Sequence, residues 1–182
     1  SIRKYVDDLL GSAIENIICM THAYPGFGDK VPRLFDAFPN VVFIEEPMAE
    51  TTFSIIAADH YRNYLMITKH LLSLNRKRIF NLRGDYRDNA FHASSKGFKD
   101  AYAEQGIEYH DSFLHICPGY AGFRDYESAR LVIESILPLN PEAMIVSNDE
   151  ALLWCIRVLN DKLIRVPEDI SLLSANLSRY GL

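Results

Sequence analysis

The 182-residue sequence has no apolar run that approaches the roughly 20 residues of a membrane span, and no signal peptide at its start. It has no basic excess either, because 19 lysines and arginines stand against 24 aspartates and glutamates, a net charge of −5. Without that attraction to phosphates, the chain is not expected to bind nucleic acid unaided. Its 48% hydrophobic and 24% charged residues are ordinary for a globular protein. Its length allows one large α/β domain or two small lobes.

Cysteine and histidine are sparse in ways that argue against two kinds of site. Cys19, Cys117 and Cys155 form no C-x-x-C pair and are odd in number, which favours a reducing, cytoplasmic setting over a secreted disulfide scaffold. The six histidines show neither H-x-x-x-H nor H-E-x-x-H spacing, so no metal site is expected. Only His92, beside a turn-rich loop, remains a candidate for binding a ligand.

Two glycine-containing stretches resemble functional motifs without meeting their requirements. "PGFGDK" (25–30) lacks the G-K-[ST] ending and the spacing of a phosphate-binding loop, so a flexible turn is the better interpretation. "ASSKG" (93–97) puts Ser95 in the nucleophile place of a hydrolase elbow, but Ser95 falls inside a predicted helix and no Asp-then-His order follows it. No other nucleophile or base has a partner in reach. The sequence therefore predicts neither an enzyme nor a cofactor site.

What the sequence does contain is a regular alternation of short apolar runs with amphipathic stretches. The runs are unbroken, which is typical of strands buried on both faces. The candidate strands are residues 15–20, 40–45, 53–58, 77–82, 112–117, 143–147 and 170–174. The main candidate helices are residues 59–74, 92–105, 125–137 and 148–161. Strands that alternate with helices predict parallel βαβ units and an open α/β sheet.

A polar pair, Asn148–Asp149, follows the apolar run 143–146 directly. Either side chain can cap the next helix, because Asn and Asp accept hydrogen bonds from the first free amides of a helix. Alternatively, Asp149 lies at the carboxyl end of a parallel strand, where open α/β sheets bind ligands, and accepts ligand hydroxyls. Both interpretations hold if one residue caps and the other binds.

The periodicity of the following helix predicts the position of Trp154. With Leu152 at the centre of the apolar face and Leu153 near it, Trp154 lies at about 200° from Leu152, using 100° per residue. It is therefore expected to point away from the sheet, on the side of Arg157. A large outward aromatic is more often a subunit contact than an isolated surface residue. We therefore predict that Trp154 and Arg157 contribute to a homodimer interface.

Three stretches, in this order, resemble the effector-binding domain of LacI/GalR-family transcriptional regulators. They span residues 58–84, 94–107 and 141–176. The first has an aspartate that opens a helix, a His-Leu pair and a basic-Ile strand. The second has Gly-Phe at the end of an R-x-x-G-F motif, and the third has a P-x-A strand ending in Asn-Asp and a V-P-x-D-[IV]-S element. The matching residues are Asp59, His70-Leu71, Lys77–Ile79, Gly97-Phe98, Pro141 to Asp149 and Val166 to Ser171.

The resemblance implies a fold of two Rossmann-like lobes of periplasmic-binding-protein type I, with parallel sheets flanked by helices and an effector between the lobes. On that pattern residues 1–75 belong to the N-terminal lobe, which is incomplete here. Residues 76–174 form the C-terminal lobe, and residues 175–182 begin the return to the first lobe. Operator DNA would be bound only through a helix-turn-helix domain absent from this chain, and a homodimer would transmit the effector signal.

The resemblance also implies an effector site. Glu45 stands where the family often has a ligand-binding aspartate, and Asp149 supplies a second carboxylate. Paired acceptors suit a polyhydroxylated ligand such as a sugar, aided by aromatic stacking. Tyr120, Phe123 and Tyr126 lie in the segment that supplies such aromatics in the family, although packing under the following helix explains them equally well.

One departure from the family pattern concerns the arginine of R-x-x-G-F, which often grips the effector and is Ser94 here. Serine cannot replace a forked, permanently charged donor. Arg83, Arg87 and His92 are the candidates to supply this function instead. Ser94 itself and Met20, at the end of the first predicted strand, complete the predicted effector-binding set.

The sequence thus predicts a small-molecule sensor domain of a LacI-type transcription regulator, acting without catalysis. The first alternative is a periplasmic sugar-binding protein of a transporter, which shares the fold and works as a monomer. The second is an α/β enzyme, which would need a nucleophile or base with a partner. The third is a sensor domain fused to a different output module.

Overall fold

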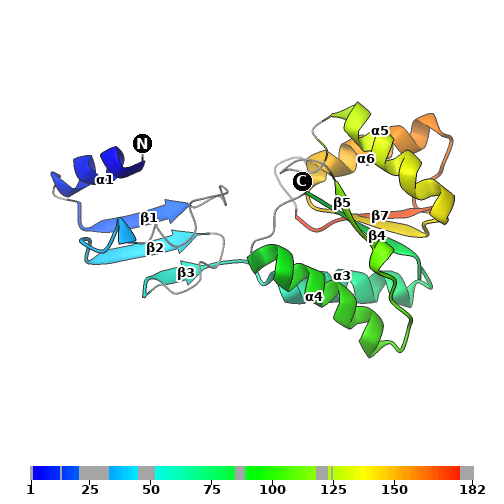
Figure 1. Ribbon diagram of the computed structural model, residues 1–182, viewed down its shortest axis with the longest axis horizontal. Coiled ribbons are helices and arrows are strands. Elements are labelled where there is room, and N and C mark those ends of the chain that lie inside the picture. Colours follow the sequence, from blue (N-terminus) through cyan, green and yellow to red (C-terminus); the bar gives the residue numbers. More distant parts are fainter. Residues whose placement is uncertain are drawn as a thin grey trace. The chain divides into compact units, whose positions relative to one another are not determined.

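The computed structural model describes residues 2–12, 14–20, 33–44, 52–84, 89–117, 123 and 125–176. The chain divides into two compact units (Figure 1). The first comprises residues 1–59 with 88–91, and the second comprises residues 60–87 with 92–182. Each unit has a parallel sheet with helices packed on it, which confirms the predicted α/β class.

The first unit has a three-stranded parallel sheet in the order β1-β2-β3. Its described elements are α1 (Ile2–Leu10), β1 (Asn16–Met20), β2 (Asn40–Ile44) and β3 (Ser54–Ile56). Side chains alternate between the two faces of a strand, and Val41 and Phe43 are buried on one face together with Val6 of α1. On the other face Ile18 and Met20 are mostly exposed.

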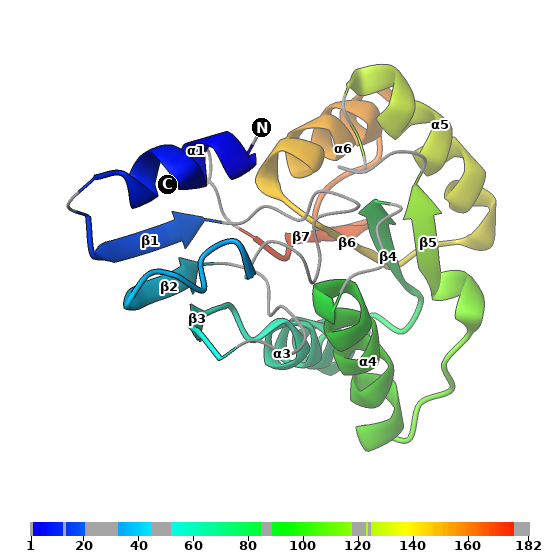
Figure 2. The same cartoon turned by 60° about the vertical axis from the view of Figure 1, so that its left-hand side comes forward.

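The second unit has a four-stranded parallel sheet in the order β5-β4-β6-β7. Figures 1 and 2 show α3 and α4 on one face of this sheet and α5 and α6 on the other, as in a doubly wound fold. Its elements are α3 (His60–Ser73), β4 (Ile79–Gly84), α4 (Asn89–Glu104, whose first residues 89–91 are grouped with the first unit), β5 (Leu114–Cys117), α5 (Tyr126–Ile136), β6 (Ala143–Val146), α6 (Asp149–Asp161) and β7 (Ser171–Ser174), with the short 3-10 helices η1 (Asp111–Phe113) and η2 (Leu137–Leu139). No helix in these described ranges is long and apolar enough to cross a bilayer.

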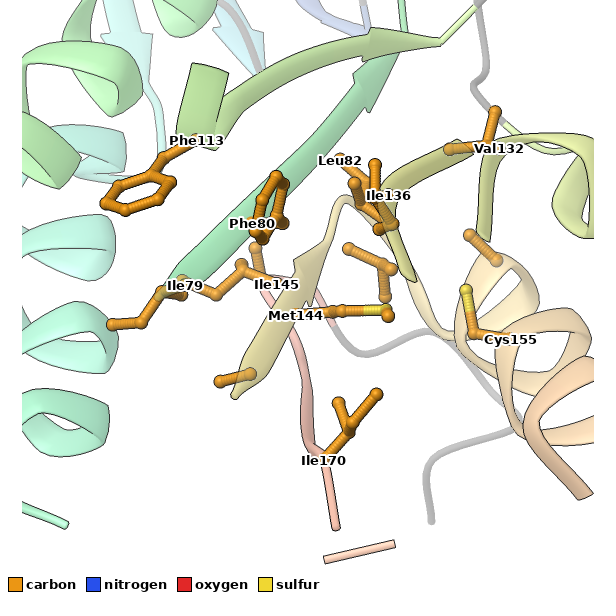
Figure 3. Packing of buried hydrophobic residues seen from close by; sticks show 14 of the residues in the cluster. Ile79, Phe80, Leu82, Phe113, Val132, Ile136, Met144, Ile145, Cys155 and Ile170 are labelled. Carbon is orange, nitrogen blue, oxygen red and sulfur yellow. The ribbon is translucent and has the colours of Figure 1, made fainter. Parts of the chain in front are cut away.

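Buried aliphatic side chains fill the space between the sheet and α5 and α6 (Figure 3). Leu82 of β4 and Met144 of β6 point from the sheet toward this layer, where Ile136 and Cys155 lie on the two helices. All four residues are almost fully buried. Strands with both faces covered explain why the sequence shows unbroken apolar runs here rather than alternation.

The carboxylate of Glu142 fixes the start of β4 against the start of β6. Its Oε2 accepts hydrogen bonds from the backbone amides of Lys77 (2.6 Å) and Arg78 (2.9 Å), and its Oε1 lies 2.8 Å from Arg78 Nη2. Burial of the Glu142 carboxyl raises its pKa. The contacts with Lys77 and Arg78 together lower the pKa by a larger amount, so it lies below its usual value. A β4–β6 register follows in which Ile79 pairs with Ala143 and Leu82 with Val146.

The structure corrects the predicted position of the boundary near residue 75. The division falls between Asp59 and His60, so α3 belongs to the second unit. The physical reason is that Tyr64, Leu71 and Leu72 of α3 are buried in the core of that unit. The predicted strands and the four main helices all appear, with ends that differ by a few residues.

Gly97 allows α4 to approach α3 closely. A Cβ added at this position would lie 2.2 Å from the backbone oxygen of Tyr61 and 3.1 Å from the backbone nitrogen of Leu65. Both are backbone atoms, so no side-chain rotation relieves the clash. The Gly-Phe pair of the sequence motif thus has a packing role, because Phe98 beside it is fully buried.

We predict that Gly97→Ala destabilises the second unit by about 1–3 kcal/mol, the usual cost of overfilling a packed interior. The measurement is the midpoint and slope of urea unfolding. Gly11→Ala is the matched control, because its added Cβ meets nothing nearer than 3.6 Å. Equal stability of the two variants would contradict the close helix–helix approach.

Candidate functional site

The carboxyl ends of β4 and β6 lie side by side, because the two strands are parallel neighbours and Leu82 pairs with Val146. The next residues along each strand end are polar: Arg83 on β4, and Ser147, Asn148 and Asp149 after β6. Open α/β sheets bind their ligands at this edge. This polar edge of the second sheet is the candidate site, and we call it the β4/β6 edge.

Asn148 caps α6. Its backbone is extended (φ −153°, ψ 168°), and its Oδ1 accepts a hydrogen bond of 2.8 Å from the backbone amide of Ala151. Asp149, the first residue of the helix, is only 3% exposed. A carboxylate in this first turn is favoured by the helix macrodipole. The pair therefore divides its work: Asn148 caps the helix, and Asp149 is held as a buried carboxylate at the strand end.

Asn176 and Asn63 connect the end of β7 to this edge, and neither of them belongs to a motif of the sequence. Asn176 Nδ2 donates to the backbone oxygen of Ser147 (3.1 Å). Asn63 Nδ2, from α3, donates to the backbone oxygen of Ala175 (2.8 Å). Both residues are polar and lie at element ends, but nothing in their spacing indicates these long-range partners.

Arg83 is buried at the end of β4, with 3% of its surface exposed. Its Nη1 donates a hydrogen bond to Ser94 Oγ of α4, and its guanidinium carbon lies 5.0 Å from the centre of the Tyr64 ring of α3. The structure therefore brings together Arg83 and Ser94. Arg83 was one of three residues considered as replacements for the family arginine, and Ser94 occupies the place of that arginine.

Cys117 ends β5 at the same edge of the sheet, where its register partner is Gly84 of β4. Burial raises the pKa of its thiol to about 12, and a hydrogen bond from the Arg83 backbone offsets part of that rise. The thiol is therefore protonated at neutral pH, and a protonated thiol is a poor nucleophile. This cysteine behaves as a small core residue.

The other predicted effector-binding residues are placed as follows. His92 is exposed in the first half of α4, and Met20 is exposed at the end of β1 in the first unit. Phe123 is 4% exposed and belongs to the core of the second unit, which supports packing rather than ligand stacking. The predictions for Glu45, Tyr120 and Arg87 concern residues outside those that the structure describes.

The structure corrects the predicted orientation of Trp154. The buried face of α6 runs through Ala151, Cys155, Val158 and Leu159, so it is not centred on Leu152. Measured from Cys155 at about 100° per residue, Trp154 lies on the flank and Leu153 lies opposite. In agreement, Trp154 packs against the core with its Nε1 buried, whereas Leu153 is 50% exposed.

Arg157 is exposed, as the prediction of an interface residue requires. Its guanidinium carbon lies 5.2 Å from the centre of the Tyr126 ring, and the Tyr126 hydroxyl donates to Asp161 Oδ2 (2.7 Å). These contacts link α5 to α6. Within the described part of the chain, no group of three or more His, Cys, Asp or Glu side chains is arranged to hold a metal ion.

Residues 68–180 match the family model of the periplasmic binding protein-like domain. The chain belongs to this family. The match runs from α3 to beyond β7 and so takes in nearly all of the second unit.

Individual relatives of this domain are transcription regulators. The chain is 24% identical over 173 residues to the HTH-type transcriptional repressor PurR of Haemophilus influenzae (strain PittGG), a match that covers 94% of this chain and 50% of PurR. Among solved structures it is similar to the transcription regulator CcpA of Lactococcus lactis, with a TM-score of 0.76, 20% identity, and coverage of 94% of this chain and 60% of that one. It is also similar to a sugar-binding transcriptional regulator (LacI family) from Escherichia coli complexed with phosphate, with a TM-score of 0.76, 19% identity, and coverage of 95% and 61%.

These comparisons confirm the resemblance to the effector-binding domain of LacI-type regulators. The two solved structures establish the fold of this periplasmic binding protein-like domain. The relatives named here are regulators rather than enzymes, which agrees with the prediction of a domain without catalysis. The chain spans about half the length of the curated relatives that it matches.

We predict that Asn148→Ala lowers the stability of the domain by about 1 kcal/mol, because the first turn of α6 loses its side-chain cap. Asn148→Asp is the control, since aspartate also accepts the Ala151 amide and favours the positive helix end. Urea unfolding of both variants measures the difference. A similar loss in both would show that the cap contributes little.

Proposed function

We propose that this domain senses a small molecule at the β4/β6 edge, as part of a LacI-type transcription regulator. The observation that carries the proposal is the buried carboxylate of Asp149 just after β6, with the buried Arg83 near the end of the neighbouring strand β4. A carboxylate accepts hydrogen bonds and a guanidinium donates them. A site with both groups is suited to orient a small polar ligand.

A sugar is the ligand class that we favour. Carboxylates bind the hydroxyl groups of sugars as hydrogen-bond acceptors, and Asp149 lies in the position that the resemblance to the family assigns to this role. One of the related solved structures is described as a sugar-binding regulator, which supports the same class.

The mechanism that we propose is a population shift. The first unit would be the N-terminal lobe and the second the C-terminal lobe, and the ligand would favour one of two relative lobe orientations. In a homodimer this preference would alter operator affinity through a helix-turn-helix domain outside this chain. Such a regulator works in the cytoplasm.

The second candidate is a periplasmic sugar-binding protein of a transporter, which is favoured by the description of the matching family. It would use the same edge to bind sugar but would be a monomer and would not respond to DNA. Specific binding of the full-length protein to a promoter fragment, altered by a ligand, supports the regulator. A full-length protein that binds sugar as a monomer without any DNA affinity supports the transporter component.

We predict that at least one member of a panel of monosaccharides, disaccharides, sugar phosphates, sugar acids and nucleobases stabilises the full-length protein in a thermal-shift assay. Asp149→Asn is expected to weaken the best binder by about tenfold or more, because the loss of a charged hydrogen-bond partner typically costs about 1.5–3 kcal/mol. Isothermal titration calorimetry measures the change in Kd.

Glu150→Gln is the matched control for this experiment. Glu150 is the next residue of α6, lies in the same helical turn and carries the same charge, but it is exposed. Equal affinities of the Asp149→Asn and wild-type proteins would refute the role of Asp149. No binding by any panel member would refute the proposed sensing function.

We also propose that the exposed side of α6 forms the homodimer contact through Leu153 and Arg157. Trp154, which was predicted to point outward, packs against the core and does not belong to this contact. Exposed apolar side chains beside an arginine are typical of protein interfaces. Leu153→Lys is expected to raise the dimer dissociation constant by about tenfold or more, as measured by analytical ultracentrifugation. Leu163→Lys is the control, because Leu163 is 90% exposed just beyond the end of the helix. A monomeric wild-type protein, or equal dissociation constants for the two variants, would contradict this interface.

A further inference from the structure

The first sheet has an apolar face that no described element covers. Paired residues of a parallel sheet point to the same side, and alternate residues of a strand share that side. Two rows of paired side chains therefore lie on one surface, which we call the open face: Ile18, Val42 and Ser54, then Met20, Ile44 and Ile56. All of them except Ser54 are apolar, and Ile18, Met20 and Ile56 are 73%, 62% and 63% exposed.

The core of the first unit lies on the opposite face of this sheet. Its buried residues are Val6 of α1, Phe35 and Phe38 before β2, and Val41 and Phe43 of β2. Among the described residues, the three exposed side chains of the open face join no buried cluster. Parallel sheets are normally covered on both faces, because their crossover connections place helices on both sides. The described part of the first unit therefore supplies one of the two layers that such a sheet requires.

The second sheet shows complete coverage within the same chain. Helices α3 and α4 pack on one of its faces and α5 and α6 on the other (Figures 1 and 2), and every residue of β6 (AMIV) is buried. Strand β1 (NIICM) is also mostly apolar, but its residues alternate between exposed and half-buried. The composition of β1 thus suits burial on both faces, whereas the described residues bury only one.

We propose that the open face is the docking surface of an amphipathic helix that belongs to the full-length protein and lies outside residues 1–182. The relatives have enough chain for such an element. The match to PurR takes in 94% of this chain but 50% of PurR, and the match to CcpA takes in 60% of CcpA. This inference goes beyond the proposed function, since it concerns the first unit and not the β4/β6 edge.

The dimensions of the open face fit one helix. A five-residue strand such as β1 is about 16 Å long, and three strands side by side are about 14 Å wide. A helix of about 11 residues spans that length and, with its side chains, most of that width. We therefore expect the covering segment to have apolar residues at positions i, i+3, i+4 and i+7.

A second copy of the chain fits the open face less well. The face measures roughly 200 Å², whereas each partner of a stable protein–protein interface buries about 800 Å². Its two rows contain no charged side chain that could orient a partner. Beside them, Asn40 Nδ2 donates to Asn16 Oδ1 (3.0 Å), so this polar pair is already engaged. These features favour a cover that comes from the same chain.

Met20 has a packing role under this inference. The sequence analysis included it in the predicted effector-binding set, but its side chain lies on the open face, two residues after Ile18. Met20 therefore contacts the covering helix rather than the effector.

Cysteine labelling of the full-length protein tests whether the open face is covered. Ile18→Cys and Ile56→Cys are made in a Cys19→Ala background, because Cys19 is only half-buried, whereas the other two cysteines are buried. Tyr5→Cys is the matched control, since Tyr5 is 72% exposed on α1 of the same unit. We expect the cysteines of the open face to react with a thiol reagent at least about a hundredfold more slowly than the control.

The labelling is repeated at two protein concentrations that differ tenfold. Protection that is the same at both concentrations supports a cover from the same chain. Protection that increases with concentration would assign the cover to a second copy and overturn the inference. Rates equal to that of the Tyr5→Cys control would overturn it as well, because the face would then be open in the full-length protein.

A photo-cross-link from Met20 identifies the covering segment without a change of side-chain size. The full-length protein is produced with photo-methionine, a diazirine analogue of methionine, and irradiated. Peptides linked to Met20 are then read by mass spectrometry from the single-chain band of a denaturing gel. We expect the linked peptide to lie outside residues 1–182 and to have the apolar spacing of an amphipathic helix. A link only to residues 1–182, or no link at all, would overturn the inference. None of these outcomes depends on effector binding.

Discussion

The parallel pairing of β4 with β6 is the constraint on which the second unit depends. Glu142 joins the starts of the two strands through the backbone amides of Lys77 and Arg78, and the register then runs without interruption to Leu82 and Val146. Because parallel strands end at the same edge, this pairing brings the polar residues that follow them together. The candidate site is thus a consequence of strand register, while the helices supply the groups that hold its side chains.

Most of the second unit could be predicted from the sequence because its strands are buried on both faces. Burial of that kind favours apolar residues along the whole strand, so β6 (Ala143–Val146) appears as an unbroken apolar run that can be recognised without knowledge of its partners. The cap at Asn148 was equally accessible, since capping depends on residues close in sequence. The boundary before α3 was not accessible. Helix α3 belongs to the unit whose core buries Tyr64 and Leu71. Which core that is depends on contacts between residues far apart in the sequence.

The errors in the predicted site have the same origin. The helical phase of Trp154 was wrong because it was measured from Leu152, and only packing reveals that Cys155 lies nearer the centre of the buried face. The sequence showed that Ser94 replaces a family arginine and left three residues as substitutes. The structure shows how one of them, Arg83, is related to that position: its guanidinium contacts Ser94 across eleven residues of sequence. A side-chain contact between a strand and the helix after it leaves no periodic signal.

A guanidinium that comes from a strand differs physically from one that comes from a helix. The backbone of β4 is paired on both sides, with β5 and with β6, so Arg83 starts from a rigid point, and its side chain is then enclosed by α3 and α4. Little conformational entropy remains to be lost when a ligand binds, which favours affinity. Enclosure also strengthens the electrostatic part of the interaction, because there is less water to screen it. The burial of the Arg83 side chain is therefore the feature that would make this site selective.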